Sequence, residues 1–173
     1  HMITAVLPGS FAPVTIGHVD LVRRATRAAD RVLVAVGVNA HKAAHFPIDQ
    51  RVEFLREALE DIPRVEVARM DGLLVDFCRE HGADLVIKGI RDSADVSWEI
   101  LQASVNREIG GVETVLLPTS PEMVHVSSSI VRELASWGMD VSRYVPPHVA
   151  RVMADNGPEG THRGAGQEGG SDV

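Results

Sequence analysis

Short runs of β-branched and aliphatic residues alternate along the chain with longer segments in which apolar positions recur at helical spacing. The short runs that favour strands are residues 3–7, 32–38, 65–68, 85–87 and 114–117. The run at 32–38 is nearly continuous in Val, Leu and Ala, as expected of a strand that helices cover on both faces. This order predicts a parallel sheet whose strands are joined by crossover helices.

The segments between these runs have the spacing of amphipathic helices. Their apolar positions are Leu21, Val22, Ala25 and Ala29 in the first, and Val52, Leu55, Leu59 and Ile62 in the second. Asp49 comes before the second stripe and is predicted to cap that helix. Further helices are predicted over 73–80 and 94–109, from the serines at 127–129, and from Pro146 through Met153. The sequence therefore predicts an α/β fold: a single-domain, doubly wound (Rossmann-like) five-stranded parallel sheet with crossover helices and a short C-terminal helix.

The chain is long and apolar enough for one domain, with 173 residues of which 45% are hydrophobic. We assign this domain to residues 1–156, in which His1-Met2 is typical of a cloning remnant and does not enter the fold prediction. The glycine-rich segment 157–173 has too few apolar groups to offset chain entropy, so we expect disorder there. The apolar runs are far shorter than the roughly 18 residues of a membrane span, and no leader precedes Ile3, so we expect a cytoplasmic protein.

Charge and cysteine content exclude several classes of function. A net charge of −7 argues against nucleic acid or an anionic membrane as a partner, because both select a basic face. The single cysteine, Cys78, cannot form an internal disulfide, and no Cys/His cluster has the spacing of structural zinc ligands. We expect Cys78 to be a buried apolar residue on a helix face.

The residues that could bind a ligand or take part in catalysis follow the ends of the predicted strands. The segments concerned are 8–18 after the first strand, 39–42 after the second, 88–91 at the end of the fourth, and 118–129 after the fifth. Taken singly, His18 can cap or pack, Lys42 and Arg91 can be surface charges, and the serines can cap a helix. Because the carboxyl ends of parallel strands meet at one edge of a sheet, all four segments together predict a site for a phosphorylated ligand.

A family resemblance makes this prediction specific. The residues Thr15-Ile16-Gly17-His18 match the [T/H]xGH signature of a nucleotidyltransferase superfamily. With Lys42, the run 88–91, Trp98-Glu99 and the run 126–129, their order and spacing resemble bacterial phosphopantetheine adenylyltransferases of coenzyme A synthesis, over about residues 3–153.

The resemblance implies that the phosphate of 4′-phosphopantetheine attacks the α-phosphate of ATP, giving dephospho-CoA and pyrophosphate. It implies Mg²⁺ held through the ATP phosphates with no protein metal ligand, a homohexamer, and CoA as a feedback inhibitor. The implied catalytic residues are His18, Ser10, Lys42 and Arg91, and those of the acceptor site are Ser10, Lys42, Leu74 and Lys88. The implied ATP site consists of Ser10, Phe11, His18, Gly89, Ile90, Arg91, Glu99, Val124, His125, Val126, Ser127, Ser128, Ser129 and Ile130.

Within this set the resemblance gives each polar side chain a role. His18 would donate to the α-phosphate, and Ser10 would hold the attacking phosphate in line. Lys42 and Arg91 would flank the phosphates as cations, and Lys88 would hold the acceptor phosphate. Leu74 would border the pantetheine arm.

Some positions depart from the family pattern. Ala12 stands where the family usually carries Asp, which removes an anchoring hydrogen bond or magnesium-side contact, and the segments 96–98 and 122–126 are less aromatic than usual. Two alternatives follow. One is a related nucleotidyltransferase that uses CTP or nicotinate mononucleotide, although the chain lacks an Arg-Thr-x-Gly-type stretch. The other is a catalytically weak nucleotide-binding or regulatory protein, for which Ala12 argues and against which His18 argues.

Overall fold

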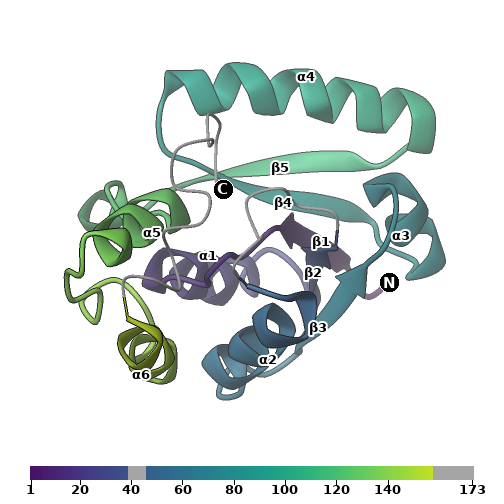
Figure 1. Cartoon of the computed structure of the whole chain (residues 1–173). Helices are drawn as coiled ribbons and strands as arrows, with labels where there is room; N and C mark the ends of the chain where they lie inside the picture. The colour runs from purple at the N-terminus through teal and green to yellow at the C-terminus, as the bar shows by residue number, and fades with distance from the viewer. Residues whose placement is uncertain (39–45, 158–173) are drawn as a thin grey trace.

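The computed structural model describes residues 1–38 and 46–157. Its centre is a five-stranded, all-parallel sheet with the strand order β3-β2-β1-β4-β5 (Figure 1). The strands are β1 (Thr4–Gly9), β2 (Arg31–Gly37), β3 (Val65–Met70), β4 (Leu85–Ile90) and β5 (Glu113–Pro118). The predicted α/β doubly wound sheet is thereby confirmed.

Helices cover both faces of the sheet because the central strands are apolar on both. Ala5 and Leu7 of β1 belong to a core shared with α1 (Ile16–Ala25), α2 (Ile48–Leu59), α5 (Ser128–Ser136) and α6 (Pro147–Asn156). Val6, between them in sequence, faces a second core that contains residues of α3 (Leu74–Glu80). The long helix α4 (Ser93–Gly110) packs beside α3 on this second face (Figure 1).

Several predicted boundaries were wrong. Asp49 lies in the first turn of α2, whose N-cap is Pro47. Its carboxylate can interact favourably with the helix dipole, but Asp49 does not cap the helix. Ala29 and Ile62 are buried as predicted, yet both lie beyond the ends of their helices, because the chain turns there toward the next strand. The predicted tail, apart from Gly157, lies outside the described residues, so its disorder stays a prediction.

Chain connectivity determines where a ligand can bind. From β1 the chain proceeds to β2 and β3 on one side, and it then crosses back to β4 and β5 on the other. The connections from β1 and β4 therefore diverge at their carboxyl ends, which leaves a crevice between them. A short 3₁₀ helix, η2 (Pro121–Met123), follows β5 at the same edge.

Two expectations from composition can be compared with the structure. Cys78 is buried on α3, as predicted. Over residues 1–38 and 46–157, no helix combines the length and the apolar character that a membrane crossing requires.

Candidate active site

The turn after β1 delivers a histidine to the start of α1. Thr15 is the N-cap residue, and its Oγ1 accepts a hydrogen bond from the His18 backbone N–H at 3.3 Å. The His18 side chain completes a capping box, because its Nδ1 accepts from the Thr15 backbone N–H at 3.0 Å. His18 thus has the capping role that the sequence left open for it.

The capping box also fixes the chemistry of the imidazole. Because a backbone N–H can only donate, Nδ1 must be the acceptor, and the neutral ring then carries its hydrogen on Nε2. Phe11 packs edge-on against this ring, with 4.9 Å between centroids. His18 is 8% exposed, so its ring is largely buried, with the apolar Phe11 beside it. The arrangement leaves His18 suited to donate a hydrogen bond rather than to accept a proton at Nδ1.

Buried side chains hold the turn between β1 and α1 through its carbonyl groups. Arg132 of α5 donates to the Ala12 carbonyl at 2.6 Å, and Ser128 donates to the Pro13 carbonyl at 2.7 Å. Arg51 of α2 donates to the Ser10 carbonyl at 2.9 Å. The Ala12 side chain is fully buried in the core. Three separate contacts therefore preorganise the backbone around Ser10.

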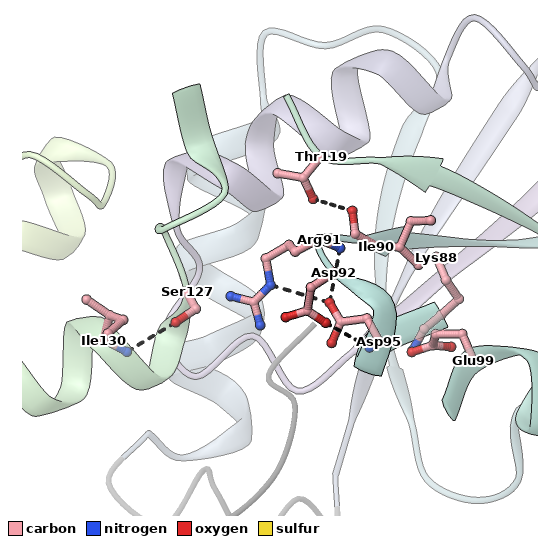
Figure 2. A network of polar contacts seen from close by, with 9 residues as sticks. All are labelled: Lys88, Ile90, Arg91, Asp92, Asp95, Glu99, Thr119, Ser127 and Ile130. Carbon is pink, nitrogen blue, oxygen red and sulfur yellow. Dashed lines mark hydrogen bonds and ion pairs between the residues drawn. The ribbon is translucent and has the colours of Figure 1, made fainter. Parts of the chain in front are cut away.

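The end of β4 carries two cations that are held by two carboxylates of α4 (Figure 2). Lys88 Nζ lies 3.3 Å from Glu99 Oε1, and both side chains are largely buried. Asp95 Oδ2 accepts from the Arg91 backbone N–H at 3.1 Å and lies 3.5 Å from Arg91 Nε. Asp95 and Glu99 are four residues apart and so lie on one face of the helix.

The side chain of Arg91 lies beside Asp95 in an ion pair. Its Nε is buried and makes no hydrogen bond among the described residues. Asp95 Oδ2 lies 3.5 Å from this nitrogen, so the ion pair helps to orient the guanidinium. Arg91 extends from the end of β4 toward Ser127, the N-cap of α5, whose Oγ accepts from the Ile130 N–H at 3.2 Å (Figure 2).

Two hollows lie at this edge of the sheet. The smaller one runs along α1 to the ends of β4 and β5 and to Ser127. It is lined by Thr15, Gly17, His18, Asp20, Leu21, Arg24, Gly89, Arg91, Thr119, Val126 and Ser127. Thr119 is tied to β4, since its N–H and hydroxyl donate to the Ile90 carbonyl at 2.8 and 2.9 Å (Figure 2).

The larger hollow, of about 480 Å³, lies over the other side of β4. Its lining is Pro8, Gly9, Ser10, Gly37, Met70, Leu73, Leu74, Lys88, Trp98, Leu101, Gln102, Val105 and Asn106. Polar groups gather at the Ser10 and Lys88 end, while the α3 and α4 side is mostly apolar. The hollows adjoin at β4, because Lys88 lines one and its neighbour Gly89 lines the other.

The structure brings together only part of the residue set implied by the resemblance. Ser10, Leu74 and Lys88 line the larger hollow, and His18, Gly89, Arg91, Val126 and Ser127 line the smaller one. Phe11 and Ser128 are buried supports, Glu99 contacts Lys88, and Ile90 and Ser129 hydrogen-bond Thr119 and Arg132 respectively. Val124, His125 and Ile130 are exposed outside both linings. Lys42 lies outside the described residues.

Sequence reasoning missed the buried residues that position this set. Asp95 follows Arg91 by four residues at a helix start, which is a spacing that could have indicated the pair. Arg51 and Arg132 gave no such signal, since their partners are backbone carbonyls far away in sequence.

The charged groups at the site favour an anionic ligand. The described residues contain no group of three or more His, Cys, Asp or Glu side chains that could hold a metal ion. Of the carboxylates at the site, Asp95 and Glu99 contact Arg91 and Lys88, and Asp20 accepts a hydrogen bond from the Ser120 hydroxyl at 2.8 Å. Histidine, lysine, arginine and helix N-termini remain, and these groups bind phosphates.

Comparisons with known proteins agree with this chemistry. A family model described as cytidylyltransferase-like matches residues 6–134. A phosphopantetheine adenylyltransferase from Cutibacterium acnes is 47% identical over 154 residues, covering 89% of this chain and 98% of the relative. One from Symbiobacterium thermophilum is 49% identical over 155 residues, covering 89% and 96%.

Solved structures share the fold at low sequence identity. A bifunctional NMN adenylyltransferase/ADP ribose pyrophosphatase from Francisella tularensis superposes with a TM-score of 0.65 at 14% identity, over 90% of this chain. This chain spans half the length of that protein. A lipopolysaccharide core biosynthesis protein from Thermoplasma volcanium gives 0.51 at 18% identity, over 69% of this chain and 98% of that one. The fold, the site and the near-complete coverage of the curated relatives lead to one assignment: the chain belongs to the phosphopantetheine adenylyltransferase family, within the cytidylyltransferase-like group.

Proposed function

We propose that the protein transfers the adenylyl group of ATP to 4′-phosphopantetheine, yielding dephospho-CoA and pyrophosphate. The observation that carries the proposal is the meeting of two different hollows across Lys88 and Gly89 of β4. One lies at helix N-termini and is lined by His18, Arg91 and Ser127, which suits a nucleotide phosphate. The other combines Ser10 and Lys88 with a long apolar wall, which suits a phosphate on a flexible, partly apolar arm.

The reaction depends more on the positioning of the two substrates than on proton transfer. The acceptor phosphate is already an anion, so no strong general base is needed for its attack on the α-phosphate. Rate acceleration then comes from in-line placement of the two substrates and from donors that meet the charge growing in the transition state. The bond between the acceptor oxygen and the α-phosphorus forms as the bond to pyrophosphate breaks.

We assign to His18 the hydrogen bond that stabilises the transition state. Its Nδ1 accepts from the Thr15 N–H, which keeps the hydrogen of the neutral ring on Nε2, the atom that we propose donates to an α-phosphate oxygen. Because the ring is fixed by the capping box and by Phe11, it needs little reorganisation when charge develops. Arg91, with its buried Nε, is proposed as a fixed cation beside the same phosphate groups.

On the acceptor side, Ser10 and Lys88 are proposed to hold the attacking phosphate, and Leu74 to border the pantetheine arm. Lys42 is proposed as a second cation at the phosphates by family resemblance alone. The remaining ATP contacts are assigned to Gly89, Ile90 and the segment 124–130. Glu99 is proposed to act at this site through Lys88, from which it lies 3.3 Å away.

Mg²⁺ is proposed as a cofactor that ATP brings with it. Mg²⁺ usually binds at substrate phosphates through phosphate oxygens and water, with few protein ligands. When bound there, Mg²⁺ neutralises part of the triphosphate charge. The protein groups named above retain the task of orienting the two substrates.

Three further proposals rest on the family and on general chemistry. A homohexamer is supported by the exposed Ile100 and Ile109 on α4, which would be buried by a neighbouring copy. Light scattering tests it, with six times the chain mass of 18.7 kDa as the expected result. CoA, which contains both the pantetheine arm and the adenylyl group, is proposed to compete at the two hollows. We also propose a cytoplasmic location, where ATP is available.

A pyrophosphate-release assay tests the proposed function. ATP and CTP are each paired with 4′-phosphopantetheine, nicotinate mononucleotide and glycerol phosphate. We expect turnover with ATP and 4′-phosphopantetheine, and dephospho-CoA among the products by mass spectrometry. Turnover with another pair and none with this one would refute the proposal. Binding of ATP with no turnover in any pair would indicate the regulatory alternative.

A further inference from the structure

Arg51 is the most completely enclosed cation of the described residues that contact the site. It is 2% exposed, although it belongs to α2, a helix that does not line either hollow. Its guanidinium donates to the Ser10 carbonyl at 2.9 Å, to the Gly37 carbonyl at 2.8 Å and to the Phe46 carbonyl at 2.8 Å. One side chain thus joins the turn after β1, the end of β2 and the segment that leads into α2.

Two of these three carbonyls belong to walls of one hollow. Ser10 and Gly37 both line the larger hollow, and neither lines the smaller one. Nη1 donates to both of these carbonyls, and Nε donates to the Phe46 carbonyl, so the planar guanidinium has a fixed orientation and holds Ser10 and Gly37 side by side. Any ligand group that contacts Ser10 is therefore positioned by Arg51 through the backbone.

Arg51 also brings a positive charge, and its hydrogen-bond partners among the described residues carry no charge to compensate it. Among the described residues its hydrogen bonds are all to neutral carbonyl groups, and burial lowers the pKa of its guanidinium from the ordinary value, although an arginine keeps its charge in a protein. A buried positive charge without a carboxylate partner is costly, so it is expected to be retained where an anion gains from it. The nearby anion in this protein would be the one that binds beside Ser10.

We infer that Arg51 is a positioning residue for the acceptor phosphate: it fixes Ser10 relative to Gly37 and adds positive potential behind them, without touching the substrate. The inference rests on the proposed function in one respect, namely that the larger hollow receives a phosphorylated acceptor. It predicts a selective effect, because the nucleotide hollow shares none of the walls that Arg51 holds.

The test compares Arg51→Lys and Arg51→Met with the wild type. Arg56→Met is the matched control, since Arg56 is an exposed arginine on the same helix. Calorimetry measures binding of 4′-phosphopantetheine and of pantetheine, which has the same arm and no phosphate. Initial rates give the KM for the acceptor and for ATP, and thermal melting reports folding.

For Arg51→Lys we expect binding of 4′-phosphopantetheine to weaken and its KM to rise by about tenfold, the factor expected when one charge-assisted hydrogen bond is lost. The KM for ATP and the binding of pantetheine should stay within about twofold of wild type, as should every value for Arg56→Met. Arg51→Met should weaken phosphopantetheine binding further because it also removes the charge.

Three results would overturn the inference. They are equal losses for both substrates, equal losses for pantetheine and its phosphorylated form, and failure of both Arg51 variants to fold, which would assign Arg51 to stability alone. Because the calorimetric comparison does not need turnover, it is separate from the proposed function. A wild-type protein that binds 4′-phosphopantetheine but releases no pyrophosphate would refute the function and leave the Arg51 comparison decisive for its own claim.

Discussion

His18 combines a structural and a proposed chemical role on opposite nitrogens of one ring. Its Nδ1 accepts the Thr15 N–H and so helps to start α1, while Nε2 keeps the hydrogen that the proposed mechanism uses. Sequence reasoning treated capping and catalysis as alternatives for this residue. The capping box makes them compatible, because the cap selects the tautomer that can donate.

Variants of His18 can separate these roles. We predict that His18→Ala lowers kcat by roughly 10²- to 10³-fold, with a small change in the KM for ATP, because the donor is needed mainly in the transition state. His18→Asn has an oxygen that can replace Nδ1 in the cap, so it should lose a similar factor in kcat and keep more thermal stability than the alanine variant. Steady-state kinetics and melting curves check this. A loss confined to KM would mean that His18 only binds the ground state.

Asp95 is predicted to set the orientation of Arg91. Asp95→Asn keeps an oxygen for the Arg91 N–H but removes the charge that lies 3.5 Å from Nε, so we expect kcat to fall by roughly 10- to 100-fold. Asp92→Asn is the control: Asp92 caps α4 through the Asp95 N–H, is exposed, and can be replaced as a cap by asparagine. In an Arg91→Ala background the Asp95 change should cost little. Additive losses in that double variant would contradict the prediction.

At the scale of elements, periodicity predicted which segments are helices and strands but not where all of them end. Ala29 and Ile62 continue an apolar stripe because they are buried, yet burial in a turn gives the same signal as burial in a helix. The doubly wound order was predictable because parallel strands with crossover helices allow few arrangements. Long-range contacts of Arg51 and Arg132 to backbone carbonyls have no periodic signal, so the supports of the site were not predictable.

The contact between α3 and α4 depends on a glycine. A Cβ added at Gly110 would lie 2.6 Å from Val75 Cβ, which no side-chain rotation relieves. We predict that Gly110→Ala lowers the free energy of unfolding by roughly 1–3 kcal/mol, as overpacking does. Gly72→Ala, where an added Cβ meets nothing within 4 Å, should stay within about 0.5 kcal/mol of wild type. Chemical denaturation measures both, and equal values for the two variants would contradict the packing argument.

Burial of Cys78 on α3 leads us to predict how the stability of the fold depends on pH. Burial raises the pKa of its thiol to about 11, from an ordinary value of 9.0. Because the folded state holds the proton more tightly than the unfolded state, this thiol should lower the stability as pH rises from about 9 to about 11. Cys78→Ala should show a shallower fall in that window, measured by denaturation at each pH. Identical slopes would show that the thiol does not contribute.

At the scale of the whole molecule, this acidic protein has several cationic side chains at the edge of the sheet where the strand order reverses. The net charge is −7, but Lys88, Arg91, Arg51 and Arg132 surround or support the edge between β1 and β4. The topology explains this placement, since only at that edge do neighbouring crossovers diverge. The sequence predicted this edge and the phosphate chemistry, while the division into a nucleotide hollow and an acceptor hollow required the structure.

The central claim is that the two hollows hold ATP and the acceptor for a single in-line displacement at the α-phosphorus. The most direct measurement uses ATP made chiral at the α-phosphorus by sulfur substitution, with 4′-phosphopantetheine as acceptor, and determines the configuration of the thio-analogue of dephospho-CoA. We predict inversion, because one displacement occurs between substrates bound side by side. Retention would contradict the account, since it requires an even number of displacements and hence a covalent adenylyl intermediate on the protein.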